Sequence, residues 1–174
     1  MATLILVLRI VHILGGVFWA GAAFVMAWFI EPTVRAAGDD GRRFMARLGA
    51  TGTFTRAMAA TAGATVLAGL WLLWIVSSGF LTEFFETGRG LALGAGMVLG
   101  IVAFVVGFVM QNRPIRRMAG IGKAVAAAGG PPSPGQAAEM EKLTAKVRLG
   151  GRIVAGLLLV TVILMASARY LPSF

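Results

Sequence analysis

Four long apolar stretches, separated by polar connections, dominate the chain. An α-helix that crosses a bilayer needs about 20 consecutive, mostly apolar residues, and each stretch is long enough. They cover approximately residues 4–30, 56–76, 91–110 and 151–170. The pattern predicts an all-α polytopic membrane protein, a four-transmembrane-helix bundle in a single membrane domain over residues 1–174. Its two long connections cover residues 31–55 and 111–150.

Turn-forming and amphipathic segments organise the connections. Glu31-Pro32 is expected to stop the first helix, because a proline ring removes a helical hydrogen bond and clashes with the preceding turn. The segment 133–136, Ser-Pro-Gly-Gln, has the form of a capping box and predicts a helix that leads into the fourth span. In the first connection, three apolar residues share one helical face that arginines flank: Phe44, Met45 and Leu48. They indicate either a short helix in the membrane interface or an ordinary basic loop.

Composition and charge placement agree with a membrane location. Hydrophobic residues make up 58% of the chain and charged residues 13%, whereas soluble domains average about half and about a quarter. The net charge is +9, but no nucleic-acid-binding motif is present, and 13 of the 16 basic residues lie in the two long connections or at the starts of the spans that follow them. The positive-inside rule then predicts an inner (plasma) membrane protein with cytoplasmic connections, both termini outside, and anionic lipid head groups as partners.

The two halves of the chain share a short motif. The pattern P-x-x-R-x-A-G occurs at residues 32–38 and again at 114–120, and Arg-Leu-Gly precedes the second and fourth spans. Either the bundle consists of two parallel-repeat hairpins, or the echo arises by chance in a chain rich in Ala, Gly and Arg. Small residues at helical spacing, including Gly96 and Gly100, predict close helix packing, and a homodimer or a larger membrane complex is a candidate assembly.

Several kinds of chemistry are excluded or disfavoured. The chain has no Cys and one His, which excludes disulfides, thiol catalysis and zinc sites built on several His or Cys ligands. No Asp or Glu lies inside a predicted span, which disfavours ion-coupled transport, since such proteins place carboxylates in the membrane. A Ser-His-Asp hydrolase would lack an Asp near the histidine.

His12, in the first span, is the candidate ligand for a cofactor or metal. An iron porphyrin held by imidazole also needs a second axial ligand, groups that satisfy its carboxylates, and space beside the ring. The candidate haem-binding residues, chosen by depth and helical face, are His12, Arg9, Gly15, Gly16, Met97, Met165 and Arg169. A symmetry-related His12, or no group at all, are the other options for the second axial position. Alternatively, the imidazole hydrogen-bonds a backbone carbonyl or a hydroxyl of a neighbouring helix, with Thr161 and Ser167 as candidates.

Residues 9–21, Arg-Ile-Val-His-Ile-Leu-Gly-Gly-Val-Phe-Trp-Ala-Gly, resemble the start of CopD-like integral membrane proteins. That group includes copper-resistance D proteins, HemJ-type protoporphyrinogen oxidases and uncharacterised relatives, and Ala-Arg-Tyr at 168–170 is similar to the last of these. The resemblance implies that His12 corresponds to the first-helix histidine that HemJ-type members associate with haem b. Spans two to four contain no internal lysine, which HemJ-type enzymes carry, so oxidase activity is not transferred.

Two functions from different classes follow from the sequence. The first is a haem b-binding or redox-associated membrane module with His12 as axial ligand. The alternative is a non-catalytic structural or accessory subunit of a larger membrane complex. A small-molecule channel or carrier ranks last.

Overall fold

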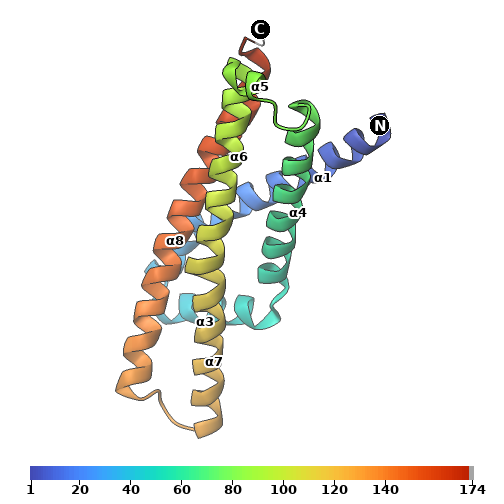
Figure 1. Ribbon diagram of the computed structural model, residues 1–174. Coiled ribbons are helices and arrows are strands. Elements are labelled where there is room, and N and C mark those ends of the chain that lie inside the picture. The colour runs from blue at the N-terminus through green and yellow to red at the C-terminus, as the bar shows by residue number, and fades with distance from the viewer. Residues whose placement is uncertain (173–174) are drawn as a thin grey trace.

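The computed structural model describes residues 1–172, and this part of the chain is almost entirely helical, without strands. Four helices are long and apolar enough to cross a membrane, which confirms the predicted all-α four-helix bundle. The N-terminus and the last described residues lie toward the same end of the elongated bundle (Figure 1). The four are α1 (Ala2–Val25) continued by η1 (Met26–Ile30) and α2 (Glu31–Ala36); α4 (Thr53–Val76); α6 (Gly88–Gly107) continued by η2 (Phe108–Asn112) and α7 (Arg113–Ala128); and α8 (Pro134–Ser167) with the 3-10 turn η3 (Ala168–Tyr170).

The first helix does not stop at Glu31-Pro32, so the predicted helix end was wrong. Pro32 is the second residue of α2, and α2 follows directly on the π-helical turn η1. The backbone N–H of Glu31 bonds the carbonyl of Met26, a spacing of five residues instead of four. This wider turn leaves space for the proline ring. It also needs no hydrogen bond from the proline nitrogen, which has no N–H, so the helix continues. The third span continues past Pro114 by the same means, through η2.

The two copies of the repeated motif therefore begin on the same local structure. A π turn precedes the first proline and the second proline by the same number of residues. After the prolines the copies differ, because the first helix breaks at Ala37 and Gly38, with a φ of +57°, begins α3, whereas Gly120 stays inside α7. The two copies of the motif thus share a π turn as well as a sequence pattern. A duplication of whole hairpins stays a prediction.

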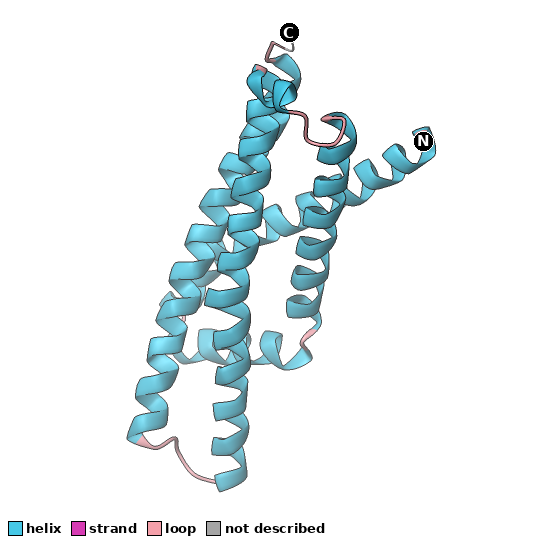
Figure 2. Ribbon diagram, in the orientation of Figure 1, coloured by secondary structure: helices cyan, strands magenta, loops and turns pink. Residues whose placement is uncertain are grey.

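Two shorter helices and few loops join the spans (Figure 2). The helix α3 (Gly38–Thr51) lies across the bundle beside the start of α4, while α7 and α8 extend beyond it, and its Phe44 and Met45 are exposed (Figure 1). The other, α5 (Thr82–Glu86), lies near the C-terminal end of the bundle. The predicted capping box at the start of α8 is confirmed: the Ser133 N–H donates to Gln136 Oε1 at 2.9 Å, and the Gln136 N–H donates to Ser133 Oγ at 3.3 Å.

Sequential spans pair most extensively. The helix α1 packs mainly on α4 and α6 mainly on α8, while smaller α1–α8 and α4–α6 contacts close the bundle. Consequently α1 and α6 lie diagonally across from each other. Small side chains dominate the core, because alanine lets two helix backbones approach closely. The core residues are Trp19, Ala23, Ala27, Ala62, Ala103, Val154, Ala155 and Leu158.

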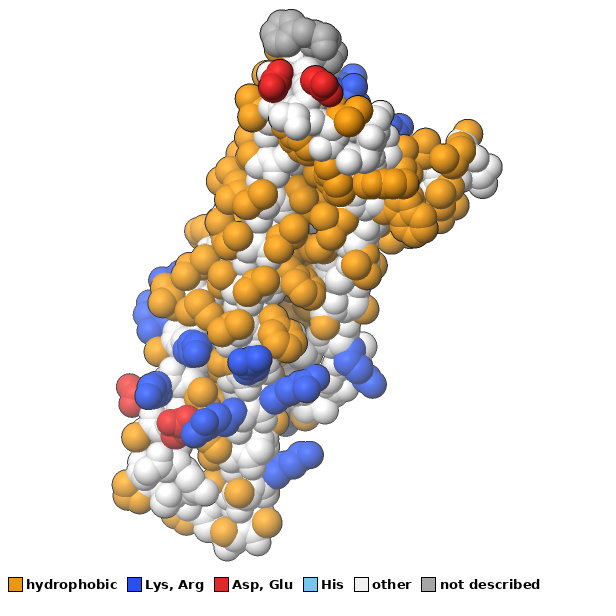
Figure 3. All heavy atoms as spheres, in the orientation of Figure 1, with side chains coloured by type: hydrophobic (Ala, Val, Ile, Leu, Met, Phe, Trp, Pro, Cys, Tyr) orange, Lys and Arg blue, Asp and Glu red, His pale blue; other side chains and the backbone are white. Residues whose placement is uncertain are grey.

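Charge is concentrated toward one end of the molecule (Figure 3). Lysine and arginine side chains gather over α3, α7 and the first half of α8, and an apolar band covers the middle of the visible face. Two ion pairs tie neighbouring elements there: Arg117 to Glu139 at 2.9 Å, and Arg152 to Glu31 at 3.2 Å. Because these pairs are partly exposed, we expect each to contribute little stability.

Gly150 marks the closest approach between α8 and η2. A Cβ at this position would lie 2.6 Å from the Met110 Cβ, so one backbone would have to move. We expect Gly150→Ala to lower the free energy of unfolding by about 1–3 kcal/mol, the usual cost of overpacking. Chemical denaturation in detergent, followed by circular dichroism, measures it.

Gly156→Ala is the matched control on the same helix. A Cβ at Gly156 would meet nothing within 4 Å, so this variant should be neutral or gain up to about 1 kcal/mol from helix propensity. Equal stability of the two variants would contradict the tight α8–η2 contact.

Candidate functional site

The His12 side chain lies between α1 and α4 and is held by the backbone of α4. Its Nδ1 is 2.8 Å from the carbonyl oxygen of Thr65. A carbonyl can only accept, so Nδ1 carries the proton and donates. Residues 1–172 offer the other ring nitrogen, Nε2, no hydrogen-bond partner. The bond to α4 thus fixes the orientation of the ring and leaves Nε2 as the nitrogen that a ligand can approach.

Gly69 makes room for this ring. A Cβ on Gly69 would lie 2.7 Å from His12 Cε1, 2.8 Å from His12 Nδ1 and 3.1 Å from Met97 Cε. Gly69 follows Thr65 by one helical turn, and in an α-helix its N–H bonds the same Thr65 carbonyl. The second lone pair of that carbonyl stays reachable because Gly69 has no side chain.

Thr65 and Gly69 were missed by the sequence reasoning. It anticipated a bond from His12 to a neighbouring helix, but it named Thr161 and Ser167 as candidate partners. Both hydroxyls instead donate within α8, Thr161 to the Leu157 carbonyl at 2.9 Å and Ser167 to the Leu164 carbonyl at 3.1 Å. The spacing Thr-x-x-x-Gly in the second span was the available signal for these two residues. It could not be interpreted without knowing that α1 packs on α4.

A cavity of about 400 Å³ adjoins His12 between α1, α4, α6 and α8. It brings together four predicted site residues: His12, Gly16, Met97 and Met165. Met97 is buried. Met165 packs on Gly96, where an added Cβ would lie 3.1 Å from Met165 Cγ. The remaining lining residues are Ile13, Trp19, Ala20, Thr65, Val66, Gly96, Gly100, Leu158, Thr161, Val162 and Ala166.

Three other predicted site residues lie outside this lining. Gly15 faces α4, where its Cβ position is only 2.6 Å from Thr65 Oγ1, so it permits helix packing and is not part of an open slot. Arg9 and Arg169 are exposed. The Arg169 guanidinium lies 4.8 Å from the centre of the Tyr170 ring. Neither arginine borders the cavity.

The cavity offers few donor groups, and its lining contains no carboxylate, lysine or arginine. The described residues contain no cluster of three His, Cys, Asp or Glu side chains that could hold a bare metal ion. The Thr65 hydroxyl is buried without a hydrogen-bond partner and lies against Gly15. One imidazole, two thioethers and apolar walls suit a flat, largely apolar ligand that presents a metal to the imidazole.

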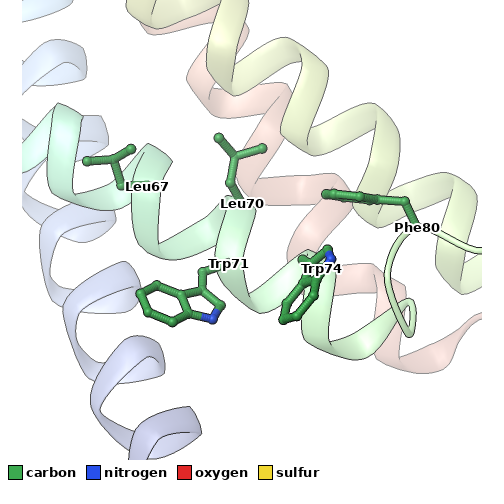
Figure 4. Close-up of a pocket in the computed structure, with 5 residues that line it drawn as sticks. All are labelled: Leu67, Leu70, Trp71, Trp74 and Phe80. Carbon is green, nitrogen blue, oxygen red and sulfur yellow. The ribbon is translucent and has the colours of Figure 1, made fainter.

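A second hollow, of about 530 Å³, lies on the outer surface of α4 (Figure 4). Trp71 and Trp74 are half exposed, and Phe80 approaches from the following loop, where its φ is +65° and its N–H bonds Ser77 Oγ. Broad and apolar, this surface fits the aromatic anchoring expected of membrane-facing tryptophans. Its lining consists of Leu67, Leu70, Trp71, Trp74 and Phe80.

No known protein family, curated protein or solved structure matches the chain. The geometry around His12 is therefore the ground on which function is inferred.

Proposed function

We propose that this integral membrane protein binds haem b in the cavity beside His12, with Nε2 of His12 as axial ligand. The hydrogen bond from Nδ1 to the Thr65 carbonyl carries the proposal. Histidines that ligate metals generally donate their other ring N–H to a carbonyl or carboxylate, which fixes the tautomer and raises the basicity of the ligating nitrogen.

The other cavity residues fit a porphyrin in chemical character. Met97 lies on the helix diagonally across from that of His12, and Met165 lies on α8, so either thioether is a candidate second ligand. The walls are otherwise apolar apart from two threonines. Bound haem would supply one-electron transfer at its iron, while the protein would set its orientation and exclude water.

Arg9 and Arg169 are proposed to pair with the haem carboxylates. Each lies about one helical turn beyond a lining residue, Arg9 beyond Ile13 and Arg169 beyond Ala166. Neither has an ion-pair partner among residues 1–172. An unpaired guanidinium near an apolar cavity is well suited to a carboxylate.

The absorption spectrum of protein purified in detergent from haem-replete cells tests this function. We expect a Soret band that shifts on reduction with dithionite, and a pyridine adduct spectrum typical of haem b. Colourless protein that also fails to bind added haem would overturn the proposal.

A second candidate is an accessory subunit of a larger membrane complex. It is favoured by the least buried span, α1, whose N-terminal part diverges from the other helices (Figure 1). Co-purification with a stoichiometric partner would support this role. Stable, monodisperse protein without any partner would count against it.

We also propose that the end carrying the basic residues faces the cytoplasm of a cell with an inner (plasma) membrane. Unpaired basic side chains there include Arg47, Arg116 and Lys123, which would contact anionic lipid head groups. Phe44 and Met45 of α3 would then dip into the inner leaflet. Both termini would lie outside.

Single-cysteine labelling measures this orientation cleanly, because the chain has no cysteine of its own. We expect Thr82→Cys, at the start of α5, to react with a membrane-impermeant maleimide in spheroplasts. Ala138→Cys, in the exposed first turns of α8, should react only after permeabilisation. The reverse pattern would show that the basic end lies outside.

A further inference from the structure

The wall of the His12 cavity is not equally closed on all sides. Its lining residues from α4 and α6 are buried or half buried. In contrast, Ile13 of α1 is 57% exposed and Val162 of α8 is 49% exposed. Ala166 of α8 is exposed as well. All exposed lining residues thus lie on α1 and α8, and the cavity opens between these two helices.

The path of α1 explains this opening. Toward the basic end, Trp19, Ala23 and Ala27 pack against the α8 residues of the core. Beyond Trp19, α1 crosses behind α4 and diverges from α8 toward its N-terminus (Figure 1). The space between α1 and α8 therefore widens from the contact at Trp19 toward the N-terminus of α1. The exposed lining residues lie along the edges of this space.

The surroundings of the gap are apolar. The neighbouring surface residues on the two helices, Val17 and Ile163, are large, apolar and exposed, and no charged residue lines the cavity. In a membrane-spanning bundle such a surface meets the hydrocarbon of the bilayer, because contact between large apolar side chains and water is unfavourable.

We propose that the gap between α1 and α8 is a lateral portal through which a flat, apolar ligand dissolved in the membrane reaches His12. The ligand class is thus one that partitions into the bilayer before it binds. This inference rests on the proposed function only in taking the ligand to be flat and apolar, and its test uses no haem.

Trp19 reports on the cavity from within. It lines the cavity, is only 6% exposed, and its ring packs edge-on against Phe104 at 6.4 Å between centroids. The test uses ligand-free protein, in which the other three tryptophans are replaced by phenylalanine (Trp28→Phe, Trp71→Phe and Trp74→Phe), so that the tryptophan fluorescence of proteoliposomes comes from Trp19 alone. Naphthoquinone dissolved in the bilayer is the lipid-side quencher, and acrylamide is the water-side quencher.

We expect naphthoquinone to quench Trp19 several times more strongly than acrylamide does. Ala166→Phe, which narrows the portal, should reduce the naphthoquinone quenching constant by about half or more, and Ile13→Ala, which widens it, should raise that constant. Val160→Phe is the matched control, because Val160 is exposed on α8 outside the cavity lining. Each variant is first checked for helical content and monodispersity.

Two results would overturn the portal. One is acrylamide quenching equal to that by naphthoquinone, which would mean that the cavity opens to water. The other is naphthoquinone quenching that both portal variants leave at the level of the Val160→Phe control. Either result leaves the absorption spectrum of the unmodified protein to decide on haem, and a colourless protein with the expected quenching pattern would refute haem binding while keeping the portal.

Discussion

His12→Ala is expected to abolish the Soret band of the purified protein. His12 is the only imidazole in the chain, and the two thioethers of the cavity, Met97 and Met165, are the only other soft donors beside it. Since the truncated side chain leaves iron without a nitrogen ligand, haem should be lost during purification. Visible absorption, normalised to protein concentration, measures the loss.

Imidazole added to His12→Ala should restore part of the band, because the deleted ring leaves a space of its own shape. Ser167→Ala is the matched control on α8, outside the cavity lining. It removes a hydroxyl that bonds the Leu164 carbonyl within α8 and leaves the His12–Thr65 pair untouched. A band of wild-type intensity in His12→Ala would refute ligation by this residue.

Gly69→Ala should weaken haem binding about 10–100-fold, the range found when groups that orient a ligating histidine are removed. The added methyl would lie less than 3 Å from two atoms of the imidazole ring, and the ring cannot retreat without breaking its bond to Thr65. Overpacking of this kind also costs about 1–3 kcal/mol of folding free energy. Titration of ligand-free protein with haem, together with denaturation, measures both effects.

Gly63→Ala separates this local effect from a general cost of altering α4. Gly63 lies on the same helix, and a Cβ there would meet nothing within 4 Å, so this variant should bind haem like the unmodified protein. Equal affinity of Gly69→Ala and Gly63→Ala for haem would show that the space at Gly69 beside the imidazole does not govern ligand binding.

Much of the fold followed from local pattern. The four spans and the capping box at Ser133 are present as predicted, and of the two alternatives left open for the first connection the structure has the helix. Such features depend on hydrophobic length and on contacts between residues a few positions apart. The continuation of the first and third spans past Pro32 and Pro114 was harder to predict, since a single π turn decides whether a proline stops a helix or is accommodated.

The candidate site was predicted in part. His12, Gly16, Met97 and Met165 meet at one cavity, because depth along a membrane helix follows from counting residues. Gly15 turned out to be a packing contact with Thr65. Depth says nothing about the rotation of one helix against another, and that rotation decides which of two adjacent glycines borders a cavity.

The sequence by itself determined that the chain forms four membrane-crossing helices and places one imidazole among apolar side chains, because hydrophobic length and residue type are properties of each segment. Only the tertiary structure decided that Thr65 orients His12, that Gly69 seats it, and that the cavity opens between α1 and α8. These features depend on crossing angles and helix rotation. Both arise from the packing of small residues summed over the whole bundle, and no single segment encodes them.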